Sequence, residues 1–167
     1  MTERQKFDLV KKIVGTKVEI RRYHPCVMAD VIVEAPYSQA PSLGFRPLVT
    51  YISKNNIAMT APVLQESTDL SSWIISFVMP AEMKLEDLPN PEGSKVTLRT
   101  LSEQLCASLA FSGITTTAKV QEKEVELRAA LTKEGLTPIG ALRIARFDPP
   151  WKPGILRYNE VILDIKP

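Results

Sequence analysis

The sequence predicts an α+β fold built from two repeats, each with the order strand–strand–helix–strand–strand. Several short segments alternate apolar and polar residues with a period of two, which is typical of half-buried strands. Two longer segments place apolar residues three and four positions apart, which is typical of amphipathic helices. The apolar pattern of the first half also recurs in the second half, offset by about 78 residues. Together these observations indicate an internal duplication.

The first repeat begins with a predicted hairpin. Residues 7–14 are largely apolar, the Gly-Thr-Lys sequence at 15–17 breaks the run, and residues 18–21 alternate. The alternation resumes over 27–33, where the residues at odd positions are all apolar and share one face. We therefore expect three strands before the first helix: one over 7–14, and the two over 18–21 and 27–33 whose pattern recurs in the second half.

The first helix is predicted to start between Ser42 and Phe45 and to end near Lys54–Asn56. Its apolar stripe consists of Phe45, Leu48, Val49 and Ile52. Pro47 fits such a helix only in the first turn, because proline lacks a backbone N–H and clashes with the preceding turn. We expect the stripe to pack on the sheet, and to line a pocket only where the sheet leaves part of it open.

Two further strands are predicted to complete the first repeat. The segment 58–63 leads into a short strand, and the run from Trp73 to Met79 is nearly all apolar. Such a run is typical of a strand that is covered on both faces. The proline-rich and acidic stretch 80–93 then predicts a long surface connection.

The second repeat follows the same order. Alternation predicts strands over 96–99 and 105–111, and a threonine run at 115–117 offers an N-cap for the second helix. Gly135 is expected just past the end of this helix. Two last strands are expected at 142–147 and 161–165, and a proline-stiffened loop at 148–154 lies between them.

We interpret residues 1–167 as one domain with internal repeats at about 7–79 and 94–166. A chain of this length can bury one sizeable core. Two units with unfinished apolar faces would close on one another and leave a groove between them. Because such grooves are common ligand sites, function is expected at the seam between the repeats.

Composition excludes several function classes. Hydrophobic residues make up 44% and charged residues 24%, as in an ordinary soluble chain. The net charge of +2 is too small to indicate the basic surface that a nucleic-acid-binding protein needs. No apolar run is long enough to span a bilayer, and the polar N-terminus lacks the core of a signal peptide. We therefore expect a cytoplasmic protein with no membrane span and no nucleic-acid partner.

The chain lacks the standard catalytic motifs, namely a nucleophile elbow, a phosphate-binding glycine loop and an HExxH sequence. Cys26 and Cys106 are too few for a disulfide framework or an all-cysteine metal site, and we interpret them as packing residues. His24, the single histidine, is interpreted as a turn residue, with axial coordination of iron as the alternative. Six cations form either a solvated face or a clamp for carboxylates: Arg21, Arg22, Arg143, Arg146, Lys152 and Arg157.

Several strings, taken in order, resemble the SOUL haem-binding family. The first are Val18-Glu19-Ile20-Arg21-Arg22-Tyr23, Gly44–Ile52, Ile57–Val63 and Phe77–Pro80. The others are Phe111-Ser112-Gly113, Ala145–Pro153 and Arg157–Val161. The resemblance runs from about Phe7 to the C-terminus. Its Met-Thr-Ala-Pro and Asp-Pro-Pro-Trp-Lys-Pro strings are specific when they occur together.

The resemblance implies a distorted antiparallel eight-stranded barrel or curved sheet, made from two repeats that each carry one helix. It also implies non-enzymatic, non-covalent binding of haem or another tetrapyrrole in a shallow apolar groove, as a carrier or buffer. The chain would act as a monomer or weak homodimer. The groove residues that it implies are Phe45, Leu48 and Val49, with Lys152 reaching a propionate; to these we add Ile52 of the same stripe and Arg22 as a further cation.

One position departs from the family pattern. A described member carries its axial histidine immediately before the tyrosine of the first string, where this chain has Arg22. His24 lies just after Tyr23 and is the remaining candidate for the iron. We therefore expect binding to rest on dispersion and on propionate pairing, with weak or absent coordination of the metal.

Two other functions stay open. A small-molecule sensor of the gyrase-inhibitor-like effector type would bind apolar or cationic ligands at the seam, where buried acids would favour cations. A hydrolase on the same scaffold would need a buried glutamate with a raised pKa beside a tyrosine or tryptophan. The acids to locate for both functions are Glu66, Glu82 and Glu160.

Overall fold

The computed structural model describes residues 2–68 and 71–167. Its strands are β1 (Glu3–Arg4), β2 (Phe7–Lys12), β3 (Val18–Tyr23), β4 (Cys26–Val33), β5 (Thr60–Ala61), β6 (Val63–Ser67), β7 (Trp73–Val78), β8 (Thr97–Leu101), β9 (Gln104–Ser112), β10 (Pro138–Arg146) and β11 (Tyr158–Ile165). Its helices are α1 (Ala40–Lys54) and α2 (Thr117–Lys133), with short 3-10 helices at Leu85–Asp87 and Gly154–Leu156.

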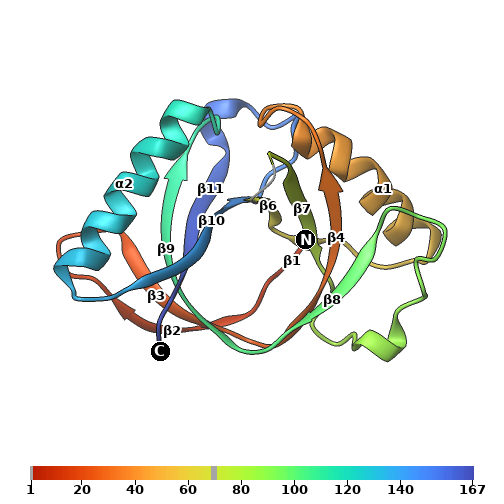
Figure 1. Cartoon of the computed structure of the whole chain (residues 1–167), viewed down its shortest axis with the longest axis horizontal. Helices are drawn as coiled ribbons and strands as arrows, with labels where there is room; N and C mark the ends of the chain where they lie inside the picture. The colour runs from red at the N-terminus through yellow and green to blue at the C-terminus, as the bar shows by residue number, and fades with distance from the viewer. Residues whose placement is uncertain (1, 69–70) are drawn as a thin grey trace.

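Nine of these strands form one antiparallel sheet in the order β2-β3-β9-β11-β10-β6-β7-β4-β8. The predicted α+β class is confirmed. The sheet has nine strands and not eight, because β2 joins its edge by pairing with β3 as the expected hairpin. Figure 1 shows the sheet curling into a half-barrel, with α1 and α2 on its outer side.

The repeated order occurs as β3-β4-α1-β6-β7 and β8-β9-α2-β10-β11. The first strands of the two repeats are exchanged, because β3 pairs with β9 and β4 pairs with β8. β6 and β10 pair in the middle of the sheet and join the two halves. The exchange makes each half of the sheet depend on both repeats.

Alternation along the strands gives the sheet two different faces. The outer face buries one apolar cluster under α1, around Leu48 and Phe77, and another under α2, around Leu127 and Leu109. The inner face carries a third, smaller cluster, which we call the inner floor: Tyr23, Met28, Leu64, Val78, Cys106, Ala145 and Ile162. The inner floor lies where the two repeats meet.

The helix ends follow local chemistry. Thr116 caps α2 as expected, since its hydroxyl accepts the N–H of Lys119 at 3.1 Å, and Gly135 follows the helix with a φ of 71°. α1 begins at Ala40, earlier than predicted, because Pro41 occupies the first turn, where a missing N–H is harmless. Pro47 then lies inside the helix and not in its first turn.

The predicted bounds of two strands were too short. β10 starts at Pro138 and β11 at Tyr158, whereas the apolar alternation began at 142 and 161. The added residues include polar side chains that face the inner side of the sheet, so apolar periodicity did not reveal them. β7 is covered on both faces, as its continuous apolar run predicted. No helix among the described residues is long and apolar enough to cross a membrane.

Candidate functional site

The stripe predicted on α1 divides into a buried and an accessible part. Leu48 is completely buried and Ile52 nearly so, because both pack on the outer face of the sheet. Phe45 is 39% exposed, and its ring meets the ring of Phe77 edge to face with centroids 5.4 Å apart. Val49 is half-buried. A ligand on this side of α1 would therefore touch Phe45 and Val49 first.

Lys152 lies in the loop between β10 and β11. Its Nζ pairs with Asp148 Oδ1 at 3.1 Å, and its carbonyl accepts a hydrogen bond from Arg157 Nε at 2.9 Å. No hydrogen bond, ion pair or ring contact among the described residues joins this loop to the stripe on α1. The loop nevertheless keeps part of Lys152 accessible, since the side chain is 39% exposed on a proline-stiffened backbone.

Large exposed apolar side chains are neighbours of Lys152 in the sequence of this loop. Trp151 and Ile155 are each 83% exposed. A Cβ on Gly154 would lie 2.7 Å from Ile114 Cγ1, so the neighbouring loop brings a further exposed side chain into contact. We call these exposed residues the tip patch: Ile114, Trp151, Ile155 and Leu156. Sequence reasoning missed the patch, because proline-rich loops carry no periodicity that separates exposed from buried apolar residues.

Across residues 2–68 and 71–167, Arg22 and His24 contact neither the apolar stripe on α1 nor the tip patch. Arg22 is exposed and pairs with Glu103 at 3.5 Å. His24 follows β3, and its Nε2 lies 3.1 Å from Asp8 Oδ2 on the neighbouring hairpin strand. No contact among the described residues brings either side chain to α1 or to Lys152. No cluster of three or more histidine, cysteine, aspartate or glutamate side chains in the described part of the chain could hold a metal ion.

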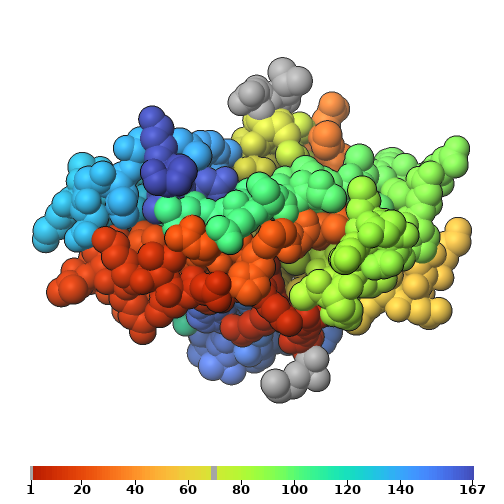
Figure 2. Space-filling model, turned by 90° about the horizontal axis from the view of Figure 1, so that it is seen from below, coloured from red at the N-terminus to blue at the C-terminus, as the bar shows by residue number. Residues whose placement is uncertain are grey.

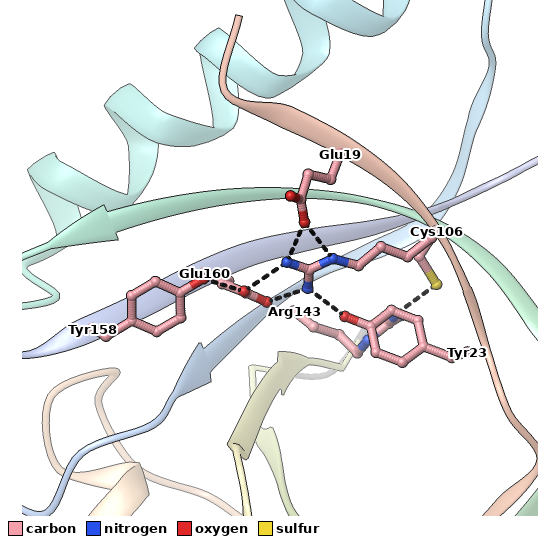
Figure 3. A network of polar contacts seen from close by, with 7 residues as sticks. Glu19, Tyr23, Cys106, Arg143, Tyr158 and Glu160 are labelled. Atoms are coloured by element: carbon pink, nitrogen blue, oxygen red, sulfur yellow. Dashed lines mark hydrogen bonds and ion pairs between the residues drawn. The ribbon is translucent and has the colours of Figure 1, made fainter. Parts of the chain in front are cut away.

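The conspicuous polar feature is a buried network on the inner face, centred on Arg21. Its Nη1 donates to Glu160 Oε1 at 2.7 Å and its Nη2 to Glu19 Oε1 at 2.7 Å. Tyr23 Oη accepts from Nη1 at 2.9 Å, and Tyr158 Oη donates to Glu160 Oε2 at 2.6 Å. Figure 3 shows these groups converging on one guanidinium, which the hydrogen bonds identify as that of Arg21.

This network accounts for several residues of the family strings. Arg21 and Glu160 are both nearly inaccessible, and burial together with the bond to Glu160 raises the pKa of Tyr158 to about 12. Arg143 is likewise engaged, since its Nη2 donates to Asp164 Oδ1 at 2.9 Å. Arg21 fits neither alternative proposed for it, since it is neither solvated nor free to clamp a ligand, whereas Arg143 is only partly buried and also lines a cavity. They tie the strands of the inner face together.

A cavity of about 80 Å³ lies at the seam over the inner floor. Its polar walls include Glu66, Arg99 and Arg143. The carboxylate of Glu66 makes no hydrogen bond or ion pair with any described residue; burial raises the pKa of its carboxyl, and the charges of Arg143 and Arg99 oppose that shift. Of the three acids sought, Glu66 is thus the one that faces a cavity. Glu160 is buried in the Arg21 network, and Glu82 is exposed.

The N-terminal segment crosses this seam. Residues 2–6, which we call the strap, run across the inside of the half-barrel in Figure 1 and lie beside the 147–157 loop at one end of the molecule in Figure 2. The backbone N–H of Gln5 donates to the carbonyl of Ala61 at 2.8 Å. Gln5 separates the seam cavity from a second space of about 120 Å³, which is lined by His24 and Cys26 among others. Nothing in the sequence indicated that the N-terminus folds back in this way.

The comparisons with known proteins agree with this architecture. The family model described as SOUL heme-binding protein matches residues 2–164. The search of curated proteins finds no match.

Solved structures show the same fold at low identity. The C-terminal domain of EcmrR superposes with a TM-score of 0.72 at 11% identity, covering 92% of this chain and 99% of that one. A hydrolase from Listeria innocua gives 0.63 at 15% identity, covering 94% of both chains. SAV2435 bound to tetraphenylphosphonium gives 0.54 at 8% identity, covering 90% of this chain and 94% of that one.

At these identities the structural likeness shows the fold alone. The family match is stronger evidence, because it compares the sequence itself with a family model and covers residues 2–164, nearly the whole chain. The chain belongs to the SOUL haem-binding family.

Proposed function

We propose that this protein binds haem or a related tetrapyrrole non-covalently, as a cytosolic carrier or buffer without catalytic activity. Family membership and the tip patch support the proposal. A tetrapyrrole needs an apolar surface for its ring and cations for its propionates. The exposed side chains of Trp151 and Ile155 supply the first and Lys152 the second, so the residues present fit the group. A propionate would compete with Asp148 for the lysine.

The first prediction concerns the tip patch. Titration with haem is expected to give a saturable change in the Soret band, and Trp151→Ala should lower the affinity about two- to tenfold through loss of a stacking surface. Val14→Ala is the matched control, because Val14 is 95% exposed in the turn between β2 and β3, far from the loop. An absence of saturable binding would contradict the proposal, and equal affinities of the two variants would remove the tip patch from it.

The second prediction concerns the iron. His24→Ala is expected to leave the Soret maximum of the haem complex unchanged, because the imidazole is already paired with Asp8 on the hairpin and lies apart from the tip patch. The measurement is an absorption spectrum of each complex at saturating protein. A displaced maximum in the variant would instead assign His24 as an axial ligand.

A second candidate function is the binding of a small organic cation at the seam. The carboxylate of Glu66 favours it, since a partly buried carboxylate that forms no direct ion pair with a described residue attracts a positive charge, even though Arg143 and Arg99 of the same cavity already act on it. The structural neighbour SAV2435 is described with tetraphenylphosphonium bound. We keep this function separate from tetrapyrrole binding because Glu66 would repel propionates.

The third prediction tests the seam by calorimetric titration with tetraphenylphosphonium. Glu66→Gln should weaken binding roughly tenfold by removing the opposite charge, whereas the exposed Glu82→Gln should not. The affinity of the unmodified protein should fall as the pH drops through the raised pKa of Glu66, because the neutral acid no longer attracts the cation. A pH profile that survives Glu66→Gln would exclude Glu66 as its source.

A further inference from the structure

Arg4 of the strap is a cation that lies against two neighbouring aromatic rings. Its guanidinium carbon lies 4.9 Å from the ring centroid of Phe147 and 5.4 Å from that of Tyr158. The two rings meet edge to face, with centroids 5.1 Å apart. No carboxylate of a described residue lies within ion-pair distance of Arg4. The rings are therefore its principal partners.

Asp148 completes the surroundings of this guanidinium. Its Oδ2 accepts the backbone N–H of Tyr158 at 2.6 Å, and that hydrogen bond holds the pKa of the carboxyl below its usual range. The charges of Lys152 and Arg4 act in the same direction. We call the group of Phe147, Asp148 and Tyr158 the aromatic corner. Two ring faces beside an ionised carboxylate are the chemistry that recognises organic cations.

The strap that carries Arg4 is held by a two-residue ladder and a few single hydrogen bonds, among them Gln5 N–H to Ala61 O at 2.8 Å and Ala81 N–H to Glu3 Oε1 at 3.5 Å. β1 pairs with β5 over two residues in the register Glu3–Thr60 and Arg4–Ala61. Beyond it, the carbonyl of Lys6 accepts the N–H of His24 at 3.1 Å. Open pockets of about 80 and 120 Å³ lie beside Gln5. A strap held by so few bonds, with open space beside it, is a segment that an entering ligand can displace.

We propose that the aromatic corner is a subsite for an organic cation and that Arg4 occupies it when no ligand is bound. The proposal rests on the second function proposed above and adds its recognition element and its gate. A ligand of drug size does not fit the seam while the strap is in place, because such sites enclose roughly 300 Å³ or more. An entering cation would replace the guanidinium at the rings and lift the strap.

The test compares two strap variants. Arg4→Ala is expected to raise the affinity for tetraphenylphosphonium about three- to tenfold, because the ligand no longer competes with a resident cation. Lys6→Ala is the matched control, since it removes a strap cation that touches neither ring. Phe147→Leu, combined with Arg4→Ala, should abolish the gain, because leucine keeps apolar volume and removes the ring face.

Hydrogen exchange gives a readout of the strap itself. The amide of Gln5 should exchange faster in Arg4→Ala than in Lys6→Ala, and faster in the unmodified protein once the cation is added. Cation binding that depends on Glu66 but is equal in both strap variants would overturn the subsite and leave the seam function standing. A different result is that the affinity for the cation rises in Arg4→Ala, returns to its original value with Phe147→Leu and stays unchanged in Glu66→Gln. That result would support the subsite and show that Glu66 takes no part in binding the cation. No binding by any variant would overturn both.

Discussion

Arg21→Met is expected to lower the free energy of unfolding by about 3–5 kcal/mol, because it leaves the carboxylate of Glu160 buried without its partner. Glu160 is only 2% exposed, so water cannot replace the lost guanidinium. For a chain of this length the loss corresponds to a fall in Tm of about 10 °C. Urea unfolding followed by circular dichroism measures the effect.

The neighbouring Arg22→Met is the matched control. Arg22 is exposed and its pair with Glu103 spans 3.5 Å, so its removal should cost well under about 1 kcal/mol. The double variant Arg21→Met with Glu160→Met should recover much of the loss, because neither charge is then left alone in the interior. Equal stability of the two single arginine variants would show that the network contributes nothing to the fold.

Leu48→Ala is expected to cost about 2–5 kcal/mol in unfolding free energy, since it opens a cavity between α1 and the outer face of the sheet. The same variant should leave haem affinity unchanged under conditions where it is folded, because Leu48 has no accessible surface to offer a ligand. Chemical unfolding and the Soret titration together separate the two effects.

Phe45→Ala is the contrasting variant on the same helix. Phe45 keeps 39% of its surface exposed and contacts Phe77 by its ring edge, so its loss of stability should be smaller, about 1 kcal/mol. A decrease in haem affinity in Phe45→Ala alone would assign the exposed part of α1 to the ligand surface. A decrease in Leu48→Ala would mean that α1 moves away from the sheet when the ligand binds.

Much of the architecture was accessible from the residues. The alternation over 18–21 and 27–33, its recurrence in the second half, and the two helical stripes predicted the α+β class and the order of the elements. These patterns are local, since side-chain direction repeats every two residues in a strand and every 3.6 in a helix. The family strings then identified the family, because they follow one another along nearly the whole chain.

The roles of individual residues were harder to predict. Arg21 and Glu160 stand in family strings, yet one is on β3 and the other on β11, and they meet only because β9 lies between those strands. The first-helix stripe was identified correctly as apolar, but periodicity does not tell how deep each member lies. Leu48 is inaccessible while Phe45, three positions before it, reaches solvent.

The chain thus carries its strands, helices, duplication and family in short-range patterns that any reader of the sequence can recover. The exchange of first strands between the repeats, the position of Glu66 beside Arg99 and Arg143 at the seam, and the contact of Arg4 with the rings of Phe147 and Tyr158 are of another kind. Each joins residues that lie far apart along the chain, and the pairing depends on how the curled sheet closes. Sequence periodicity predicts the direction of a side chain, whereas its contacts are determined only by the packing of the folded chain.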